Sequence, residues 1–518
     1  QEQGKLQEAV EAYRQAIALK PAYADAHSNL GYALKEQGKT DEAVEAYRQA
    51  LALQPNDGTR IKLATMLPVV MPPKRELSAI RKTFEKNIAA LLKETLTIAD
   101  PVREVGQTNF YLAYQGLDDR KLQVMMAKLY ERACPSLLYV APHCKVPRRP
   151  PKGDKIKIGF VSRYFRNHSI GKISRGVIAK LSREKFRVSA IFVPPVGRDD
   201  TAAFIQRHAD QALFLPNNLR AARERIAAEE LDVLVYQDIG MDPMTYFLAF
   251  SRLAPVQCVF FGHPVTTGIG NLDYFISSSI FEPKDGADHY SERLVKFKSL
   301  GSYYYKPDVP DSLKPRSQFG LDDAEHIYIC PQTPFKFHPD FDEVLSGVLR
   351  ADPRARLVLI GSKVAQVTDL LRRRFKKEMP RAEERITFLP PQSGLDYINL
   401  IALSDVMLDT VHFGGGFTTN LEAFAVGTPV VTLLGEFQRG RHAYGFYKAM
   451  DFLDCVANTP EQYVEIAVRL GTDEKYRARI KAKILKQNHV LYEDGGAVRE
   501  FERFFIKTVG AATPPKRS

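Results

Sequence analysis

The residues with the clearest chemical potential follow a short apolar run that ends at Leu408. The next loop contains glycines and hydroxyl-bearing residues, namely Gly414, Gly415, Gly416, Thr418 and Thr419. A helical pattern follows this loop. Glycines let backbone N–H groups approach an anion, while the N-terminus of a helix adds a positive dipole and hydroxyl groups add donors. The pattern predicts a diphosphate site, and the alternative is a tight turn in which a threonine caps the helix.

Other polar residues near this loop are candidates for the same site. Glu422 lies one turn inside the expected helix, where its carboxylate can accept hydrogen bonds from ribose hydroxyls. Arg439 and Arg441 follow the next apolar run, and they either reach the phosphates or remain solvated.

Short β-rich runs alternate with helical runs from about residue 155, which is typical of βαβ units. The expected strands of a first sheet are 155–162, 186–194, 232–237, 257–262 and 274–279. A linker rich in Pro, Lys and Asp follows at 303–321, and the expected strands of a second sheet are 326–332, 356–361, 386–391, 406–409 and 429–434. The sequence therefore predicts an α/β fold with two parallel sheets, which bind ligands at the carboxyl ends of their strands.

An internal repeat precedes the sheets. The nine residues that start at Glu8 recur from Glu42, an offset of 34 residues, which is the tetratricopeptide period. Pro21 and Pro55 end the helical pairs, so the sequence holds one complete and one partial repeat. Such arrays need about three repeats for stability. We therefore expect this arm to lean on the next domain or to belong to a longer array.

Composition excludes several classes of protein. The net charge is +12, but the densest basic stretch, residues 145–157, is rich in proline and has no interleaved aromatic residues, so we expect a solvated linker and no nucleic-acid partner. The five cysteines are scattered and form no Cys-x-x-Cys pair, which argues against a disulfide framework and a zinc site. We find no signal peptide and no apolar run that spans a bilayer. We expect a cytoplasmic protein without a membrane partner.

Several segments besides the glycine-rich loop resemble glycosyltransferase family 41, which comprises the O-linked N-acetylglucosamine transferases, the SPINDLY-like proteins and their bacterial relatives. These segments are 160–169, 262–268, 273–274, 289–292, 330–336 and 425–432. With the tetratricopeptide arm, the resemblance covers nearly the whole chain. It implies two Rossmann-like lobes of the GT-B type behind an all-α arm, a UDP-sugar as donor substrate, inversion at the anomeric carbon, and neither a metal nor a cofactor.

The resemblance also implies roles on the donor side. Lys336 matches the cation that stabilises the departing diphosphate, and Gln332 lies in the same motif. Pro391, Gln392 and Tyr397 match the segment that binds uracil, where the Tyr397 ring can stack on the base. The O-linked enzymes have a histidine in the glycine-rich loop where this chain has Phe417, which we include among the donor-binding candidates.

On the acceptor side, His168 matches a loop of the family site, and we expect it to orient the acceptor or handle its proton. The alternative is a histidine that caps a turn. His263, Asp232 and Asp238 are further acceptor-side candidates, although the family has a histidine where this chain has Asp232.

Many glycosyltransferases hold a divalent ion with an Asp-x-Asp motif, and this chain contains Asp340 and Asp342. These residues follow His338 and Pro339 and open a helical run. Because acidic residues in a first turn complement the helix dipole, we interpret them as a helix start and expect no metal.

The expected division of the chain is 1–57 for the arm, 58–150 for a helical connector, 151–312 for an acceptor-side lobe, and 313–518 for a nucleotide-sugar lobe with closing C-terminal helices. The expected activity is transfer of N-acetylglucosamine from UDP-N-acetylglucosamine to Ser or Thr of acceptor proteins that the arm guides. One alternative is glucose transfer from UDP-glucose to Asn, because residues 262–267 are closer to that branch. Another is a tetratricopeptide scaffold with a dead sugar-nucleotide fold, although such a fold has no physical need for Lys336 and the loop.

Overall fold

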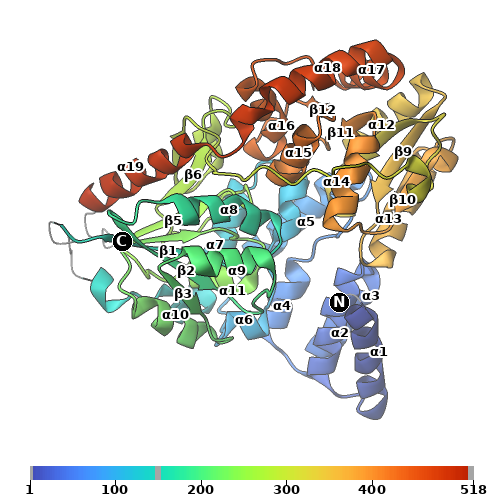
Figure 1. The fold of residues 1–518 in the computed structure, drawn as a ribbon. Coiled ribbons are helices and arrows are strands. Elements are labelled where there is room, and N and C mark those ends of the chain that lie inside the picture. The colour runs from blue at the N-terminus through green and yellow to red at the C-terminus, as the bar shows by residue number, and fades with distance from the viewer. Residues whose placement is uncertain (1–3, 146–152, 512–518) are drawn as a thin grey trace. The chain divides into compact units, whose positions relative to one another are not determined.

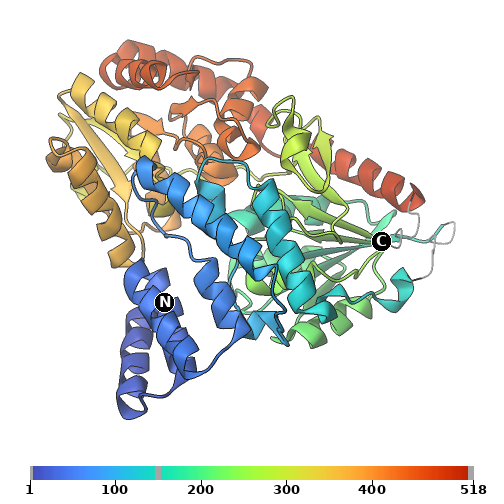
Figure 2. The same cartoon turned by 180° about the vertical axis from the view of Figure 1, so that it is seen from behind.

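The computed structural model describes residues 4–145 and 153–511 (Figures 1 and 2). Most of the expected basic linker at 145–157 therefore lies outside the described residues. The chain forms two compact units: one contains residues 1–90, 111–117 and 307–489, and the other contains residues 91–110, 118–306 and 490–518. No helix among the described residues is long and apolar enough to cross a membrane.

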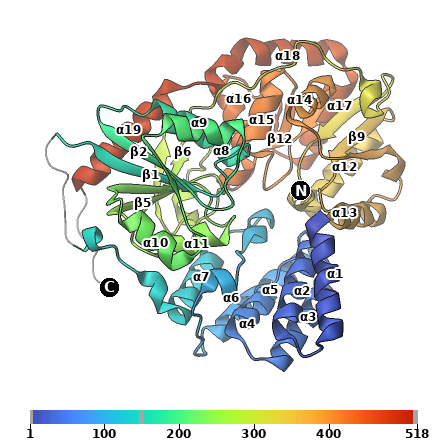
Figure 3. The ribbon, with the colours of Figure 1, turned by 60° about the horizontal axis from the view of Figure 1, so that its bottom comes forward.

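The first unit begins with the arm, whose helices lie side by side (Figure 3): α1 (Gly4–Leu19), α2 (Ala24–Glu36), α3 (Thr40–Leu53) and α4 (Asp57–Ala64). Its small core joins Val10, Leu34 and Ala43. A Cβ atom at Gly31 would lie 2.9 Å from Cδ1 of Tyr47, so the repeat needs glycine where α2 crosses α3. The expected tetratricopeptide packing is confirmed.

The connector follows the arm and contributes to both units. Its helices are α5 (Lys74–Leu91), α6 (Pro101–Glu104), η1 (Phe110–Tyr114), α7 (Arg120–Ala133), η2 (Pro135–Leu138) and η3 (Pro142–Cys144). Helix α5 belongs to the first unit, whereas α6 and α7 belong to the second. Residues 111–117 return to the first unit.

The second unit contains a seven-stranded sheet of order β3-β2-β1-β4-β5-β6-β7 in which every pair is parallel. Its strands are β1 (Ile156–Ser162), β2 (Phe186–Phe192), β3 (Gln211–Phe214), β4 (Val233–Tyr236), β5 (Val256–Phe260), β6 (Tyr274–Ser278) and β7 (Arg293–Phe297). Helices α8 (Ser169–Lys180) and α9 (Asp200–His208) cover one face, and α10 (Leu219–Ala227) and α11 (Pro243–Leu248) cover the other (Figure 3). The strand order reverses between β1 and β4, so the loops after these two strands flank the position where such sheets bind ligands.

The second sheet belongs to the first unit and has the order β10-β9-β8-β11-β12-β13, again with parallel pairs. Its strands are β8 (His326–Cys330), β9 (Ala355–Ile360), β10 (Ile386–Leu389), β11 (Val406–Leu408), β12 (Val430–Leu433) and β13 (Val456–Ala457). Its helices are α12 (Pro339–Ala351), α13 (Ala365–Glu378), α14 (Gly394–Leu403), α15 (Gly416–Ala425), α16 (His442–Ala449), α17 (Pro460–Thr472) and α18 (Glu474–Gln487). Here the order reverses between β8 and β11.

The C-terminal helix α19 (Gly495–Ala511) belongs to the second unit, although we expected residues 313–518 to form one lobe. Its aromatic side chains pack on strands of the first sheet: the ring of Phe505 lies 6.4 Å from that of Phe160, and the ring of Phe501 lies 4.9 Å from that of Phe297. A face of the parallel sheet is thereby covered by the last helix of the described residues.

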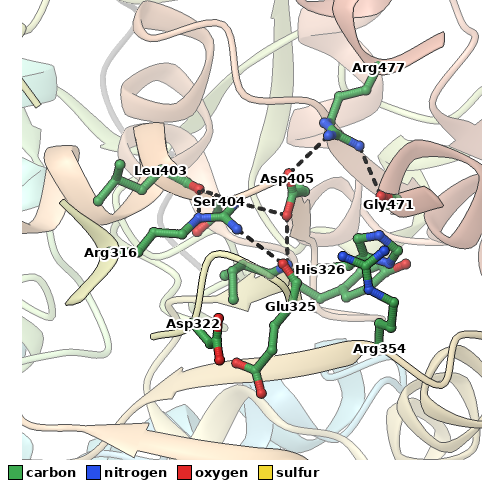
Figure 4. Close-up of polar contacts among 12 residues, drawn as sticks. Arg316, Asp322, Glu325, His326, Arg354, Leu403, Ser404, Asp405, Gly471 and Arg477 are labelled. Carbon is green, nitrogen blue, oxygen red and sulfur yellow. Dashed lines mark hydrogen bonds and ion pairs between the residues drawn. The ribbon is translucent and has the colours of Figure 1, made fainter. Parts of the chain in front are cut away.

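An ion-pair network closes the amino edge of the second sheet (Figure 4). The Asp405 carboxylate accepts hydrogen bonds from Arg316 at 3.0 Å and from the backbone N–H of Ile327 at 2.7 Å, and it pairs with Arg477 at 3.2 Å. Arg477 also donates to the carbonyl of Gly471 at 2.9 Å. The network joins the linker, the starts of β8 and β11, and α18.

Candidate active site

Asp409 organises the glycine-rich loop that follows β11. Its buried carboxylate accepts hydrogen bonds from the backbone N–H of Gly415 and, at 2.7 Å, from the hydroxyl of Thr432. Burial raises the pKa of Asp409 to about 6. The carboxylate therefore fixes the loop from inside the lobe.

The loop approaches its neighbours so closely that only glycine fits. A Cβ atom at Gly415 would lie 3.0 Å from Oδ1 of Asp409 and 3.0 Å from Nε2 of Gln332. Gly416 has φ +76°, a left-handed conformation that L side chains rarely adopt, and it begins α15. The first N–H groups of α15 point out of its N-terminus beside this turn and are suited to an anion.

Lys336 follows β8 and reaches the same loop. Its partly buried ammonium donates to Oε1 of Gln332 at 2.9 Å and to the carbonyl of Gly414 at 3.2 Å, and it lies 5.0 Å from the centre of the Phe413 ring. Desolvation lowers the pKa of Lys336 to about 8, while the charge of Asp409 opposes this effect. A cation thus lies beside the predicted diphosphate site.

Three buried polar atoms around the loop have no hydrogen-bond partner among the described residues: Nε2 of Gln332, Oγ1 of Thr418 and Oδ1 of Asn420. Leaving a buried polar group unpaired costs about 1–3 kcal/mol, so native structures rarely tolerate a cluster of them without a ligand or water. An amide N–H and a hydroxyl suit phosphate oxygens, and an amide oxygen suits a hydroxyl of the ligand.

The predicted uracil segment reaches this site through Tyr397. Its hydroxyl lies 3.2 Å from Oγ1 of Thr419. Burial raises the pKa of Tyr397, and the charge of buried Glu422 raises it further. Exposed Pro391 and partly buried Gln392 follow the end of β10, where the Gln392 side chain donates to the carbonyl of Pro390 at 2.6 Å.

In the other unit, His168 caps α8. Its Nδ1 accepts a hydrogen bond from the N–H of Ile170 at 3.2 Å, so the neutral ring carries its proton on Nε2. Desolvation, with Arg166 and Lys172 nearby, lowers the pKa of His168 to about 4. The capping alternative is therefore what the structure has, and the neutral ring offers a donor rather than a base.

Two other acceptor-side candidates lie at the carboxyl edge of the first sheet. Buried Asp238 follows β4 and accepts hydrogen bonds from the hydroxyl of Ser162 and the N–H of Arg163, both at 2.9 Å. Burial and neighbouring Asp242 raise the pKa of Asp238 to about 7. His263 follows β5, and its ring stacks on Phe110 at 5.2 Å.

Asp232 lies at the opposite edge of the first sheet from Asp238, and its acceptor-side role stays a prediction that its position does not support. It immediately precedes β4 at the amino edge of the sheet, where its carboxylate accepts from the N–H of Lys157 at 2.8 Å. Strand β4 separates Asp232 from Asp238. Through its bond to Lys157, Asp232 holds the starts of β1 and β4 together.

Comparison with known proteins decides the family. The family model described as Glycosyl transferase family 41 matches residues 123–304 and 307–492, and tetratricopeptide models match residues 2–38 and 24–57. The chain belongs to glycosyltransferase family 41. The family assignment, the tetratricopeptide arm and the two-lobed GT-B fold expected from the sequence are confirmed.

Individual relatives of this family 41 chain are distant. The probable UDP-N-acetylglucosamine–peptide N-acetylglucosaminyltransferase SEC of Arabidopsis thaliana is 25% identical over 367 residues, which are 68% of this chain and 37% of that protein. The UDP-glucose:protein N-beta-glucosyltransferase of Actinobacillus pleuropneumoniae serotype 5b is 24% identical over 354 residues, 67% of this chain and 54% of that protein. The chain thus spans about a third to a half of the length of these curated relatives.

A solved structure shares the fold of this family 41 chain. A mutant of the O-GlcNAc transferase of Thermobaculum terrenum superposes with a TM-score of 0.74 at 24% sequence identity, over 98% of this chain and 96% of that chain.

Other donor-side candidates of this family 41 chain contact residues of their own unit. The Phe417 ring packs against Phe446 at 5.0 Å and His442 at 6.0 Å within the lobe, and its role in donor binding stays a prediction. Arg439 is buried and donates to the carbonyl of Leu117 at 2.6 Å, and Arg441 donates to the carbonyl of Gly435 at 2.8 Å.

Sequence reasoning missed two polar residues of the candidate donor site, Asp409 and Asn420, and a buried histidine near it, His442. His442 is buried at the start of α16, where burial and the charge of Lys336 lower its pKa to about 3. Asp409 and Asn420 stand inside the glycine-rich motif itself, and their polar type beside glycines was the available signal. His442 had no such signal, because it follows the motif by about twenty residues.

The acidic pair Asp340 and Asp342 lies in the first turn of α12, as the helix-start interpretation predicts. Asp342 pairs with buried Arg374 at 2.8 Å. His338, Asp340 and His412 offer ligand atoms within 4.8 Å of one another, yet the Lys74 ammonium already lies 2.9 Å from Asp340. We interpret the group as a hydrogen-bonded ion cluster, and metal independence of the chain stays a prediction.

Proposed function

We propose that this chain is a protein glycosyltransferase that uses a nucleotide sugar as its donor, with acceptor proteins guided by the arm. The observation that carries the proposal is the loop at the reversal of the second sheet. There Lys336 lies beside Gly414, and buried Gln332 and Thr418 keep donors without partners. These groups are the complement of a diphosphate.

The proposed reaction is a single inverting displacement. The acceptor oxygen bonds to the anomeric carbon as the bond from that carbon to the β-phosphate oxygen breaks, and UDP leaves with the bonding electrons. Negative charge grows on the diphosphate, where Lys336 and the N–H groups of the loop stabilise it without a metal. His168 can donate a hydrogen bond to the acceptor, but its capping Nδ1 does not take the acceptor proton. That proton passes to another group or to water.

The finer proposal is transfer of N-acetylglucosamine to Ser or Thr. It is supported by relatives that are named as peptide N-acetylglucosaminyltransferases. The second candidate is transfer of glucose to Asn, because a relative of the same degree of identity is named as a UDP-glucose:protein N-beta-glucosyltransferase.

Calorimetric titration with UDP-N-acetylglucosamine, UDP-glucose and GDP-fucose separates the donors, and mass spectrometry of a peptide library treated in excess EDTA then identifies the sugar and the modified residue. Addition of an N-acetylhexosamine to Ser or Thr would support the finer proposal, whereas any peptide-linked sugar supports the coarser one. Binding of no nucleotide sugar would contradict the proposal in both forms. Transfer that stops in EDTA and returns with Mn²⁺ would contradict metal independence.

Lys336→Met tests the leaving-group role. Methionine keeps most of the apolar stem, so the lobe should fold. Removing one preorganised charged donor typically costs roughly 3–4 kcal/mol, so the transfer rate should fall by about two to three powers of ten and UDP affinity should also fall. The matched control is Lys377→Met, on the exposed side of α13. Turnover of Lys336→Met close to wild type would contradict this placement of the active site.

A further inference from the structure

His412, just before the glycine-rich loop, has a strained backbone. Its φ is +65°, and the N–H of Phe413 donates to the carbonyl of Val411 across it at 2.7 Å. A three-residue turn with positive φ is rare, and a residue other than glycine in such a conformation costs about 1–3 kcal/mol unless its surroundings hold it. Something must therefore fix His412.

Asp340 supplies that contact from the first turn of α12. Hydrogen bonds from His412 and Lys74 hold the pKa of Asp340 well below its usual range, so the group is a carboxylate and the ring donates. The bond from Nε2 of His412 to Oδ2 of Asp340 is 2.8 Å long. The ring also meets the His338 ring nearly edge-on, with 4.4 Å between centroids.

The connector closes the other side of the cluster. Lys74, at the start of α5, pairs with Oδ1 of Asp340 at 2.9 Å. A Cβ atom at Gly116 would lie 2.8 Å from Cγ of His412, so this glycine allows the connector to press on the ring. Gly116 and the start of α12 thus contact the strained residue directly, and Lys74 acts on it through Asp340.

We propose that His412 and Asp340 are positioning residues for the diphosphate of the donor, an inference that rests on the proposed function. His412 precedes Gly414, whose carbonyl holds Lys336, and Gly415, whose N–H is held by Asp409. A change of backbone angle at His412 therefore moves both the cation's anchor and the N–H groups that would bind phosphate. The His412–Asp340 contact holds the loop in its binding shape before the ligand arrives.

His412→Asn is the direct test. Asparagine tolerates positive φ, so the turn can persist, but the shorter side chain loses Asp340. We expect the Kd for UDP to rise roughly tenfold while the Kd for uridine, which has no phosphate, stays unchanged. If the role of His412 were purely structural, the Kd values for UDP and for uridine would rise together. The control is His489→Asn, at an exposed histidine of the same unit.

Asp340→Asn and the double variant complete the test. If the two residues act through one contact, the double variant should bind UDP no more weakly than the worse single variant. Asp369→Asn, in an exposed ion pair, is the matched control. Equal losses for UDP and uridine, unchanged UDP affinity, or fully additive losses would each overturn the inference. Wild-type protein that fails to bind UDP would instead overturn the proposed function on which it rests.

Discussion

Lys336 and Asp409 have pKa values displaced toward each other, and we expect this to set the pH range in which the proposed donor site is competent. The lysine is desolvated to a pKa of about 8, and the carboxyl is buried to a pKa of about 6. Between these values the lysine is a cation and the aspartate an anion. Only then does the loop have both its anchor and its positive charge.

We therefore expect a bell-shaped pH profile of kcat/KM for transfer. As pH rises through about 8, Lys336 loses its proton and the charge that stabilises the departing diphosphate, so the rate falls. As pH falls through about 6, Asp409 gains a proton and ceases to be a full acceptor for Gly415 N–H, so the rate also falls. The anionic donor should raise the pKa of Lys336 in the complex and move the basic limb of kcat to higher pH.

Lys336→Arg is the matched variant for this profile. An arginine stays charged throughout, so the basic limb should disappear even if the altered shape lowers the rate. A flat wild-type profile between pH 5 and 9, or an unchanged basic limb in the arginine variant, would contradict the assignment of that limb to Lys336.

At the residue level, the sequence predicts which side chains of a motif lie close together. It misses placements that depend on where a strand begins or ends. The glycines, Lys336 and Gln332 come together because each motif directly follows a strand of one sheet. The sequence grouped Asp232 with Asp238, but β4 begins after Asp232, so the two residues lie at opposite edges of the sheet. The packing of the Phe417 ring could not be predicted either, because its place in the motif does not tell which way the ring points.

At the level of elements, all ten expected strands are present, because buried parallel strands appear as continuous apolar runs. The sequence missed β3, β7 and β13, which are short or partly exposed and lack such a run. The sequence also could not assign α19 to its unit, because the pattern of an amphipathic helix does not identify the surface against which the helix packs. The ion-pair network around Asp405 was equally invisible, because its members are far apart in the sequence.

Asp405→Ala should affect stability but not the donor site. It leaves Arg316, Arg477 and the N–H of Ile327 without their shared acceptor (Figure 4), and breaking such a buried pair costs about 3 kcal/mol. Because the network lies at the amino edge of the sheet, the Kd for UDP should not change. Calorimetric melting should show a lowered midpoint, whereas Asp369→Ala, in an exposed pair, should melt like wild type. An unchanged midpoint for Asp405→Ala would contradict the stabilising role.

At the scale of the whole molecule, the arm is part of the unit that holds the proposed donor site. A Cβ atom at Gly38 would lie 2.2 Å from Cδ1 of Leu370, so the arm packs directly on α13. The Lys35 ammonium lies 5.9 Å from the centre of the Tyr111 ring, and that ring lies 6.0 Å from the ring of Phe335, the neighbour of Lys336. The sequence predicts an arm that guides acceptors and that leans on the next domain or belongs to a longer array, and these contacts lead us to expect that the arm also supports the proposed donor site.

Deletion of residues 1–55 separates these roles. If the arm only guides acceptors, the truncated chain should bind UDP like wild type and lose only whole-protein acceptors. Because the deletion removes Lys35 and uncovers Leu370 and Tyr111, we instead expect a lowered melting midpoint and a UDP affinity reduced roughly threefold, within the range over which packed neighbours modulate a distant site. Leu19→Ser, at the 89% exposed end of α1, is the control that should leave both quantities unchanged. A truncated chain with wild-type melting and UDP affinity would contradict the supporting role and leave the arm with acceptors alone.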